Sequence, residues 1–281
     1  MSSSEVRYRR PLNSDQLIVI GLLFRFRFGT TEYFAWRFNK PSGKHIQKRL
    51  NILEQQGYIA KHYDKSYKLQ GKPAAYYLLP KAAKLLQTKY PDGVTDQAIK
   101  NRYKDKDASE QFITHSLAIV DVYRQLRILY DTRLTMYAKI DLSLDQFCYF
   151  PKWLPDAFVT LKGGAKGSGK ERQFFLDVFE ETTPFFVLIR RIKSYLTYAQ
   201  SDLWESETDT PLPAILMVCE TEGTQKRLRR RIKKELDELW DDELATFYTT
   251  TKQELADSNQ QADKIWQLAI DTKVVRSMKL M

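Results

Sequence analysis

Apolar and polar residues recur with a helical period in three segments near the N-terminus. The first begins at Asn13 or Ser14, the second is TTEYFAWRF, and the third, GKHIQKRLNILEQQ, follows Ser42. Asn, Ser and Thr are common residues just before the first turn of a helix, and Gly57 is a common residue just after the last one. The pattern predicts three short helices ahead of Gly57.

The third predicted helix has an apolar face and a polar face. At 100° per residue, Ile46, Leu50 and Leu53 fall within a narrow arc. The other side carries basic and amide side chains, namely Lys44, His45, Lys48, Asn51 and Gln55. Such a face suits the major groove of DNA, where Lys contacts phosphate or guanine and Asn or Gln pairs with adenine. A solvated surface helix is the alternative.

A basic hairpin is predicted directly after this helix. The stretch YIAKHYDKSYKLQGKPAAYYLL contains two aromatic and β-branched runs joined by a polar turn with a glycine. Three helices and a hairpin predict a winged helix-turn-helix domain over residues 12–90. The expected wing carries four lysines that can bind phosphate, Lys61, Lys65, Lys68 and Lys72.

Charge strengthens the DNA-binding interpretation of this first domain. The chain has a formal net charge of +10, and between Lys40 and Lys89 eleven Lys or Arg side chains face two acidic ones, a net charge of +9. Counterion release makes such a concentration favourable for binding double-stranded DNA. Protein interaction is the other use of a winged helix and stays open.

Composition limits the other classes of function. Two cysteines and three histidines exclude a disulfide framework and a Cys/His zinc site, and they fit a reducing cytoplasm. The apolar run LIVIGLLF is followed by Arg25 and Arg27, so we expect a buried helix there and no membrane span. His115 lies among apolar helical positions, where a satisfied core or interface histidine is the expectation.

A second domain is predicted over residues 109–281, after a polar linker at residues 91–108. Its apolar runs predict the order α, β, β, β, α, β, α, with one helix from Pro184 to about Trp204 and a C-terminal helical extension. The fold class is thus mixed α/β, with a winged helix followed by an αβββαβ domain.

Two aspartates mark a candidate site in this domain. If the hairpin turns within GGAKGSGK, Asp156 and Asp177 share its midpoint and face each other, with Cβ atoms about 5 Å apart. Carboxylates this close repel unless a positive charge lies between them, and Mg²⁺ or Mn²⁺ is a common solution. The alternative is that both simply end exposed strands.

The predicted order of elements resembles the PD-(D/E)xK nuclease-like fold. Together with the stretches LPDAFV, FFLDVFEET and RRIKSYLTY, it resembles more closely the replication-relaxation family. The resemblance implies proteins of plasmids and other mobile elements that act in replication and DNA relaxation. It aligns Pro155 and Asp156 with the Pro-Asp pair of the family and Asp177 with an acidic position. His115 and Asp121 align with polar positions of the helix that opens the domain. Arg191 and Tyr195 fall where the family has a lysine and, four residues later, a tyrosine.

Two residues depart from the family pattern. Phe179 stands where a second acid is expected, with Glu180 just beyond it, and Arg191 replaces the lysine. Arginine stabilises developing negative charge but does not give up a proton near neutral pH. The resemblance implies a metal site of Asp156, Asp177 and Glu180, with Arg191 assisting hydrolysis of a phosphodiester.

The sequence therefore predicts a cytoplasmic DNA-binding protein that nicks DNA with a divalent metal. A homodimer is one assembly that this interpretation allows. A non-enzymatic replication or transcription regulator with a decayed nuclease fold is the alternative, and a protein-interaction adaptor is the third class.

Overall fold

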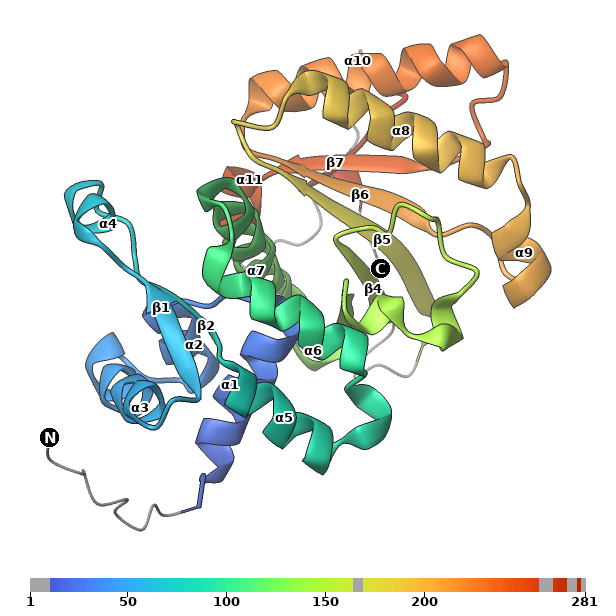
Figure 1. The fold of residues 1–281 in the computed structure, drawn as a ribbon. Coiled ribbons are helices and arrows are strands. Elements are labelled where there is room, and N and C mark those ends of the chain that lie inside the picture. Colours follow the sequence, from blue (N-terminus) through green and yellow to red (C-terminus); the bar gives the residue numbers. More distant parts are fainter. Residues whose placement is uncertain (1–10, 164–168, 258–264, 272–276, 279–281) are drawn as a thin grey trace, which may run out of the picture. The chain divides into compact units, whose positions relative to one another are not determined.

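The computed structural model describes residues 11–163, 169–257, 265–271 and 277–278. The chain divides into two compact units, Met1–Ile113 and Thr114–Met281 (Figure 1). The division falls inside helix α7 (Glu110–Tyr130), close to the predicted start of the second domain at residue 109. Within the described ranges, no helix is both long and apolar enough to cross a membrane.

Unit 1 begins with the three predicted helices, α1 (Ser14–Phe26), α2 (Thr31–Arg37) and α3 (Gly43–Gln55). Asn13 and Gln16 cap α1 by a reciprocal pair of side-chain to backbone hydrogen bonds. Ser42 occupies the N-cap position of α3 without making a side-chain cap. The apolar face of α3 is buried as predicted, through Ile46, Leu50 and Leu53.

A two-stranded antiparallel hairpin of β1 (Ile59–His62) and β2 (Ala75–Leu78) follows α3. Its connection contains the short helix α4 (Lys65–Leu69), which the sequence did not predict; Asp64 caps α4 by accepting a hydrogen bond from the backbone N–H of Tyr67. Gly29 exchanges backbone hydrogen bonds with Tyr76 of β2.

The prediction of a linker at residues 91–108 is wrong, because this segment is folded within unit 1. It contains α6 (Asp96–Tyr103), which packs on α5 (Pro80–Lys89) and buries Ala98 and Ile99. The polar composition of the segment belongs to the exposed face of this helix. Arg27 also forms an ion pair with the fully buried carboxylate of Asp105.

Unit 2 is built on a mixed sheet. Within the described residues this sheet has seven strands in the order β3-β4-β5-β6-β7-β8-β9. The first three strands run antiparallel, β5, β6 and β7 run parallel, and the last three are again antiparallel. The strands up to β6 are those predicted: β3 (Leu134–Ala138), β4 (Ala157–Lys162), β5 (Glu171–Phe179) and β6 (Ala214–Cys219).

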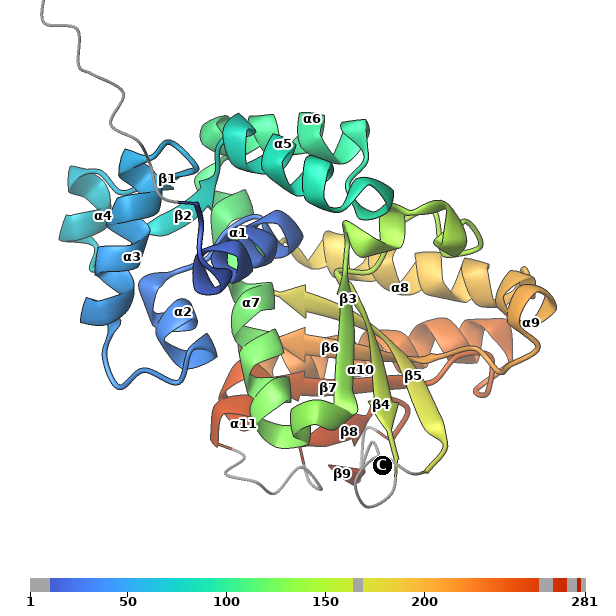
Figure 2. The same cartoon turned by 90° about the horizontal axis from the view of Figure 1, so that it is seen from below.

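Two long helices, α8 (Phe185–Ala199) and α10 (Glu222–Leu239), lie together on one face of the sheet (Figure 2). The helix predicted to run on to Trp204 ends at Ala199, because Asp202 adopts a left-handed conformation with φ of 51° before α9 (Leu203–Thr208). The opposite face of the sheet is also buried, and its buried side chains include Met136, Val159 and Leu176. Both faces of the central strands are therefore covered.

The C-terminal region corrects a second prediction. The expected helical extension after α10 is instead mostly sheet, with β7 (Phe247–Thr251), the short helix α11 (Lys252–Asp257), β8 (Trp266–Leu268) and β9 (Ser277–Met278). The run TFYTTT is β-branched and aromatic, a composition typical of strands. The strands beyond β7 are only two or three residues long, too short to leave a clear periodic pattern.

Candidate functional site

The two predicted aspartates face each other at the start of β4 and late in β5. The observed register pairs Ala157 with Leu176, so the next position along the ladder pairs Asp156 with Asp177, as the hairpin midpoint predicted. Asp177 is fully buried and Asp156 is 5% exposed. The backbone N–H of Asp156 donates to Asp177 Oδ1 at 3.3 Å, and that of Val178 donates to Asp156 Oδ2 at 3.0 Å.

His115, near the start of α7, joins this pair to a third carboxylate. Its Nε2 lies 3.1 Å from Asp156 Oδ1 and its Nδ1 lies 2.8 Å from Glu180 Oε1. Burial disfavours the charged ring, but the hydrogen bonds to Asp156 and Glu180 outweigh burial and raise the pKa of His115 to about 10. Although burial raises the pKa of Asp156, the same contact lowers it to about 2. His115 is therefore an imidazolium that donates to both acids near neutral pH.

Asp177 is held by two side chains of α8. Tyr195 donates its hydroxyl hydrogen to Asp177 Oδ2 at 2.7 Å, and Arg191 Nε lies 3.4 Å from Asp177 Oδ1. Arg191 also donates to the backbone carbonyls of Trp153 at 2.8 Å and Leu154 at 3.2 Å. Burial raises the pKa of Asp177 despite the opposing charge of Arg191. The nearby Asp177 in turn raises the pKa of Arg191 against the effect of burial.

The chain's own cations balance the charge of this cluster. Lys139, which follows β3, completes it at 3.9 Å from Asp156 Oδ1. The acid cluster, as we call it below, consists of three acidic and three basic side chains: Asp156, Asp177, Glu180, His115, Lys139 and Arg191. Because the two aspartates are buried, compensation by nearby positive charge is what allows both to remain in the fold.

Carboxylate oxygens are suitable donors for Mg²⁺ or Mn²⁺, yet those of Asp156 and Asp177 already accept hydrogen bonds. The two oxygens of Asp156 face His115 and Val178, and those of Asp177 face the backbone of Asp156 and the hydroxyl of Tyr195. In the part of the chain that the structure describes, no group of three His, Cys, Asp or Glu side chains is arranged to hold a metal ion. A metal ion bound by these oxygens would share them with the hydrogen-bond donors of the chain itself.

The acid cluster differs from the predicted set in its membership. Glu180 contacts His115 and approaches Asp156 only through that ring. His115 is satisfied, as expected, but its partners are the site acids themselves. Lys139 was missed; only the β3–β4 register, in which Ala138 pairs with Ala157, places it beside Asp156. Asp121 is exposed on α7 and lies outside the cluster.

In unit 1, the polar face of α3 has the predicted composition. Its five predicted DNA-binding side chains are all exposed: Lys44, His45, Lys48, Asn51 and Gln55. The predicted wing lysines divide into two kinds. Lys65 and Lys68 are exposed, whereas Lys61 forms an ion pair with Glu54 at 2.8 Å and Lys72 forms one with Glu110. The hydrogen bond to Glu54 raises the pKa of Lys61.

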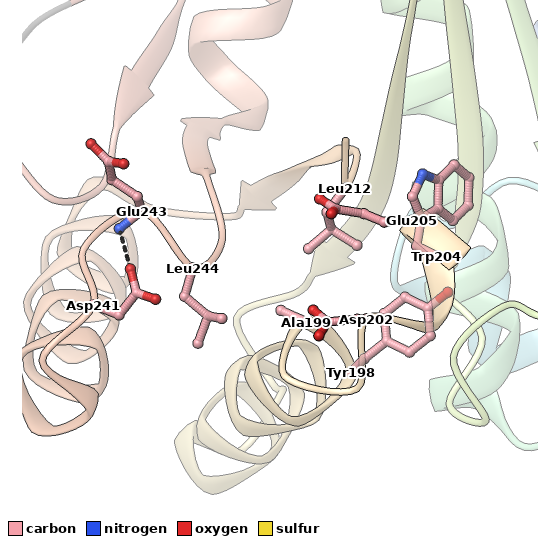
Figure 3. A pocket seen from close by; sticks show the side chains of 9 residues that line it. All are labelled: Tyr198, Ala199, Asp202, Trp204, Glu205, Leu212, Asp241, Glu243 and Leu244. Carbon is pink, nitrogen blue, oxygen red and sulfur yellow. Dashed lines mark hydrogen bonds between the residues drawn. The ribbon is translucent and has the colours of Figure 1, made fainter. Parts of the chain in front are cut away.

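Unit 2 also contains two cavities of about 300 Å³, and Trp204 is part of the lining of both. Figure 3 shows the first, with Trp204 and Tyr198 on one side and Asp241 and Glu243 on the other. The second is lined by residues of β3, β4, β5, α9 and nearby loops, namely Tyr137, Phe147, Tyr149, Phe158, Thr160, Glu171, Gln173, Trp204, Thr208 and Thr210.

The family model of replication-relaxation proteins matches residues 20–211, more than half of the chain and a range that includes the whole acid cluster. The chain belongs to the replication-relaxation family. No curated protein matches it significantly. Among solved structures it is similar to the restriction endonuclease FokI, with a TM-score of 0.32 and 9% sequence identity over 88% of this chain. The match spans 44% of that chain, and a TM-score this low does not establish a shared fold.

Proposed function

We propose that this protein is a DNA-binding replication protein of a plasmid or another mobile element, and that it binds duplex DNA through the polar face of α3. The observation that carries the proposal is the set of exposed basic and amide side chains on that face, within a segment of net charge +9. Membership of the replication-relaxation family supports a role on DNA.

The elements of unit 1 support its interpretation as a winged helix. Three helices precede an antiparallel hairpin, and the exposed face of α3 carries side chains of the types that can read base edges. In this proposal α3 enters the major groove, where Asn51 and Gln55 contact bases. Lys44 and Lys48 contact phosphate or guanine, and Lys65 and Lys68 contact the phosphate backbone from the hairpin.

For unit 2, the acid cluster favours a non-enzymatic role within a nuclease-like fold. Arg191 and His115 are the charged partners of the two buried aspartates, so the positive charges of the chain itself hold these carboxylates in the fold. Phe179 is buried where the family pattern has a second acid. In this proposal unit 2 is a platform for replication partners or for a second copy of the chain.

Metal-dependent nicking is the second candidate, and one observation favours it. Asp156 and Asp177 are opposite each other with Arg191 adjacent to them, an order of groups typical of PD-(D/E)xK nucleases. In this candidate Asp156 and Asp177, with Glu180 near them, would bind Mg²⁺ or Mn²⁺.

DNA binding is tested by fluorescence anisotropy with the full chain and labelled duplex DNA at several salt concentrations. Replacing Lys44, Lys48 and Asn51 with Ala should weaken binding and reduce the dependence of log K on log salt by about 2, because two phosphate contacts are lost. A matched control replaces Lys84, Thr88 and Lys89 of α5, which are also exposed, with Ala. Equal affinity of the first variant and the unmodified chain would contradict the proposal and favour a protein-interaction adaptor.

Nicking is tested separately on supercoiled plasmid DNA with Mg²⁺ or Mn²⁺. The favoured role predicts that plasmid remains supercoiled with both the unmodified chain and the Asp156→Asn/Asp177→Asn variant. Relaxed plasmid that forms only with the unmodified chain would establish the second candidate.

A further inference from the structure

The second cavity lies on the same face of the sheet as the acid cluster, at a different level along the strands. Phe158 and Thr160 are two and four residues beyond Asp156 on β4, so all three side chains point to one face. A layer of packed rings separates the cavity from the cluster, because Phe158 contacts Phe175 with ring centroids 5.7 Å apart. The cavity is therefore a distinct place for a ligand.

Aromatic rings form the walls of this cavity, and the ring of Trp204 is held firmly. It stacks on Phe150, with ring centroids 5.4 Å apart and an interplanar angle of 19°, and its Nε1 donates to Thr210 Oγ1 at 3.1 Å. Trp204 is 2% exposed, so the rings that a ligand reaches more easily are those of Tyr137 and Tyr149, which also line the cavity and are only half-buried. A wall that is already ordered loses little conformational entropy when a flat ligand stacks on it.

The polar lining of the cavity has hydrogen-bonding groups without protein partners. Thr160 and Gln173 are directly opposite each other on β4 and β5, and Glu171 is two residues from Gln173 on the same face. Among the described residues the side chains of Thr160, Gln173 and Glu171 make no hydrogen bond or ion pair. Glu171 is exposed and Gln173 is half-buried, and although Thr160 as a whole is 5% exposed, its hydroxyl is not fully buried. Polar groups that line a cavity and have no protein partner are free to hydrogen-bond with a ligand or with water.

We propose that this cavity binds a nucleobase. A planar heterocycle stacks on aromatic walls, and its edge offers the donors and acceptors that Thr160, Gln173 and Glu171 lack. The carboxylate of Glu171 accepts hydrogen bonds only, so it favours bases with an exocyclic amino group, which offer at least two N–H donors where thymine offers only its N3–H. Among the described lining residues none is a cation, so the phosphate of a nucleotide stays outside the cavity.

The base comes either from a free nucleoside or from an unpaired position in DNA, since the same chemistry recognises both. The inference does not rest on DNA binding by α3, because it involves other residues in the other unit. The Lys44, Lys48 and Asn51 variant should keep nucleoside binding, which makes failure of one proposal distinguishable from failure of the other.

The test uses the full chain in two arms. In the first, calorimetry measures binding of guanosine, adenosine, cytidine and thymidine. In the second, anisotropy compares a duplex that has one unpaired base with the same duplex fully paired. Thr160→Val removes the hydroxyl at constant shape, and Glu171→Gln removes the charge at constant size. Thr135→Val is the matched control. Thr135 is the partner of Thr160 on the neighbouring strand β3, but it is exposed and does not line the cavity.

We expect Thr160→Val to weaken the base-dependent binding by roughly tenfold, as for the loss of one hydrogen bond, and Glu171→Gln, at an exposed position, to weaken it by a smaller factor. Thr135→Val should leave it unchanged, and thermal unfolding should verify that all variants fold. If the variants lose affinity for nucleosides, the ligand is a free nucleoside. If they lose the preference for the duplex with the unpaired base, the ligand is a base of DNA. If base-dependent binding is absent in both arms, or unaffected by both variants, the proposal is overturned.

Discussion

The backbone N–H of Asp156 donates a hydrogen bond to Asp177 Oδ1 at 3.3 Å, across the antiparallel pair β4 and β5. The two carboxylates are adjacent and buried, but their environments differ. Contact with the imidazolium of His115 lowers the pKa of Asp156 to about 2, against the effect of burial. Burial and the neighbouring Asp156 raise the pKa of Asp177, which Arg191 only partly offsets. The cations on either side therefore determine whether this pair is stable.

Arg191 should be the cation on which the stability of unit 2 depends most. Arg191→Met leaves Asp177 buried beside Asp156 without its positive partner, so we expect a loss of roughly 3–5 kcal/mol in the free energy of unfolding. Urea denaturation followed by circular dichroism measures this change.

Two further variants make that measurement specific. Arg190→Met changes the exposed neighbour of Arg191 and should alter stability by less than about 0.5 kcal/mol. Arg191→Met combined with Asp177→Asn should recover part of the loss, because the unpaired charge is removed with its partner. Additive losses in the double variant would show that the two residues are not coupled.

His115 should give unit 2 a defined dependence of stability on pH. The pKa of His115 is raised from 6.5 to about 10 in the fold, so its stabilising contribution is complete below pH 6.5 and is lost as the pH rises through 10. The pKa of Asp156 is lowered, so the contribution of the same ion pair is also lost as the pH falls towards 2.

His115→Gln should therefore lower the free energy of unfolding by on the order of 3 kcal/mol near pH 6, with a difference that shrinks towards both extremes of pH. Denaturant unfolding of both proteins across the pH range provides the comparison. A difference that stays constant with pH would show that His115 is not charged in the fold.

Lys61 should contribute less to DNA binding than Lys48, although both belong to the basic segment. Lys61 is already paired with Glu54, whereas Lys48 is exposed on α3. We expect Lys48→Ala to reduce the salt slope of duplex binding by about 1 and Lys61→Ala to reduce it by less. Glu54→Gln should release Lys61 and strengthen binding. Equal losses for the two lysines would place the DNA elsewhere on unit 1.

Gly29 should tolerate no side chain. A Cβ at this position would lie 2.7 Å from Cζ of Phe34, a buried ring, so Gly29→Ala should destabilise unit 1 by about 1–3 kcal/mol. Gly21→Ala is the control, because Gly21 is inside α1 and a Cβ there would meet no atom within 4 Å beyond its chain neighbours and the backbone of its own helix. There the change should stabilise the helix by about 0.5–1 kcal/mol, as thermal unfolding would show. Similar effects of the two variants would contradict this account of Gly29.

Local patterns in the sequence predicted the parts of the structure that depend on nearby residues. The periodicity of α3 indicated its buried face, and the symmetry of the hairpin about its glycine-rich segment indicated the pairing of Asp156 with Asp177. Lys139 joins the acid cluster only because β3 pairs with β4, and His115 only because α7 approaches the start of β4. Such contacts depend on tertiary packing, which a local pattern does not contain.

The claim most central to this account is that the chain's own cations, and no metal ion, balance the acid cluster. Calorimetric titration of Mn²⁺ into the full chain, compared with the Asp156→Asn/Asp177→Asn variant, tests this claim most directly. We predict that the two titrations give the same heats, with no saturable binding that depends on the aspartates. Stoichiometric binding of Mn²⁺ by the unmodified chain that disappears in the variant would contradict the claim and favour the nicking enzyme.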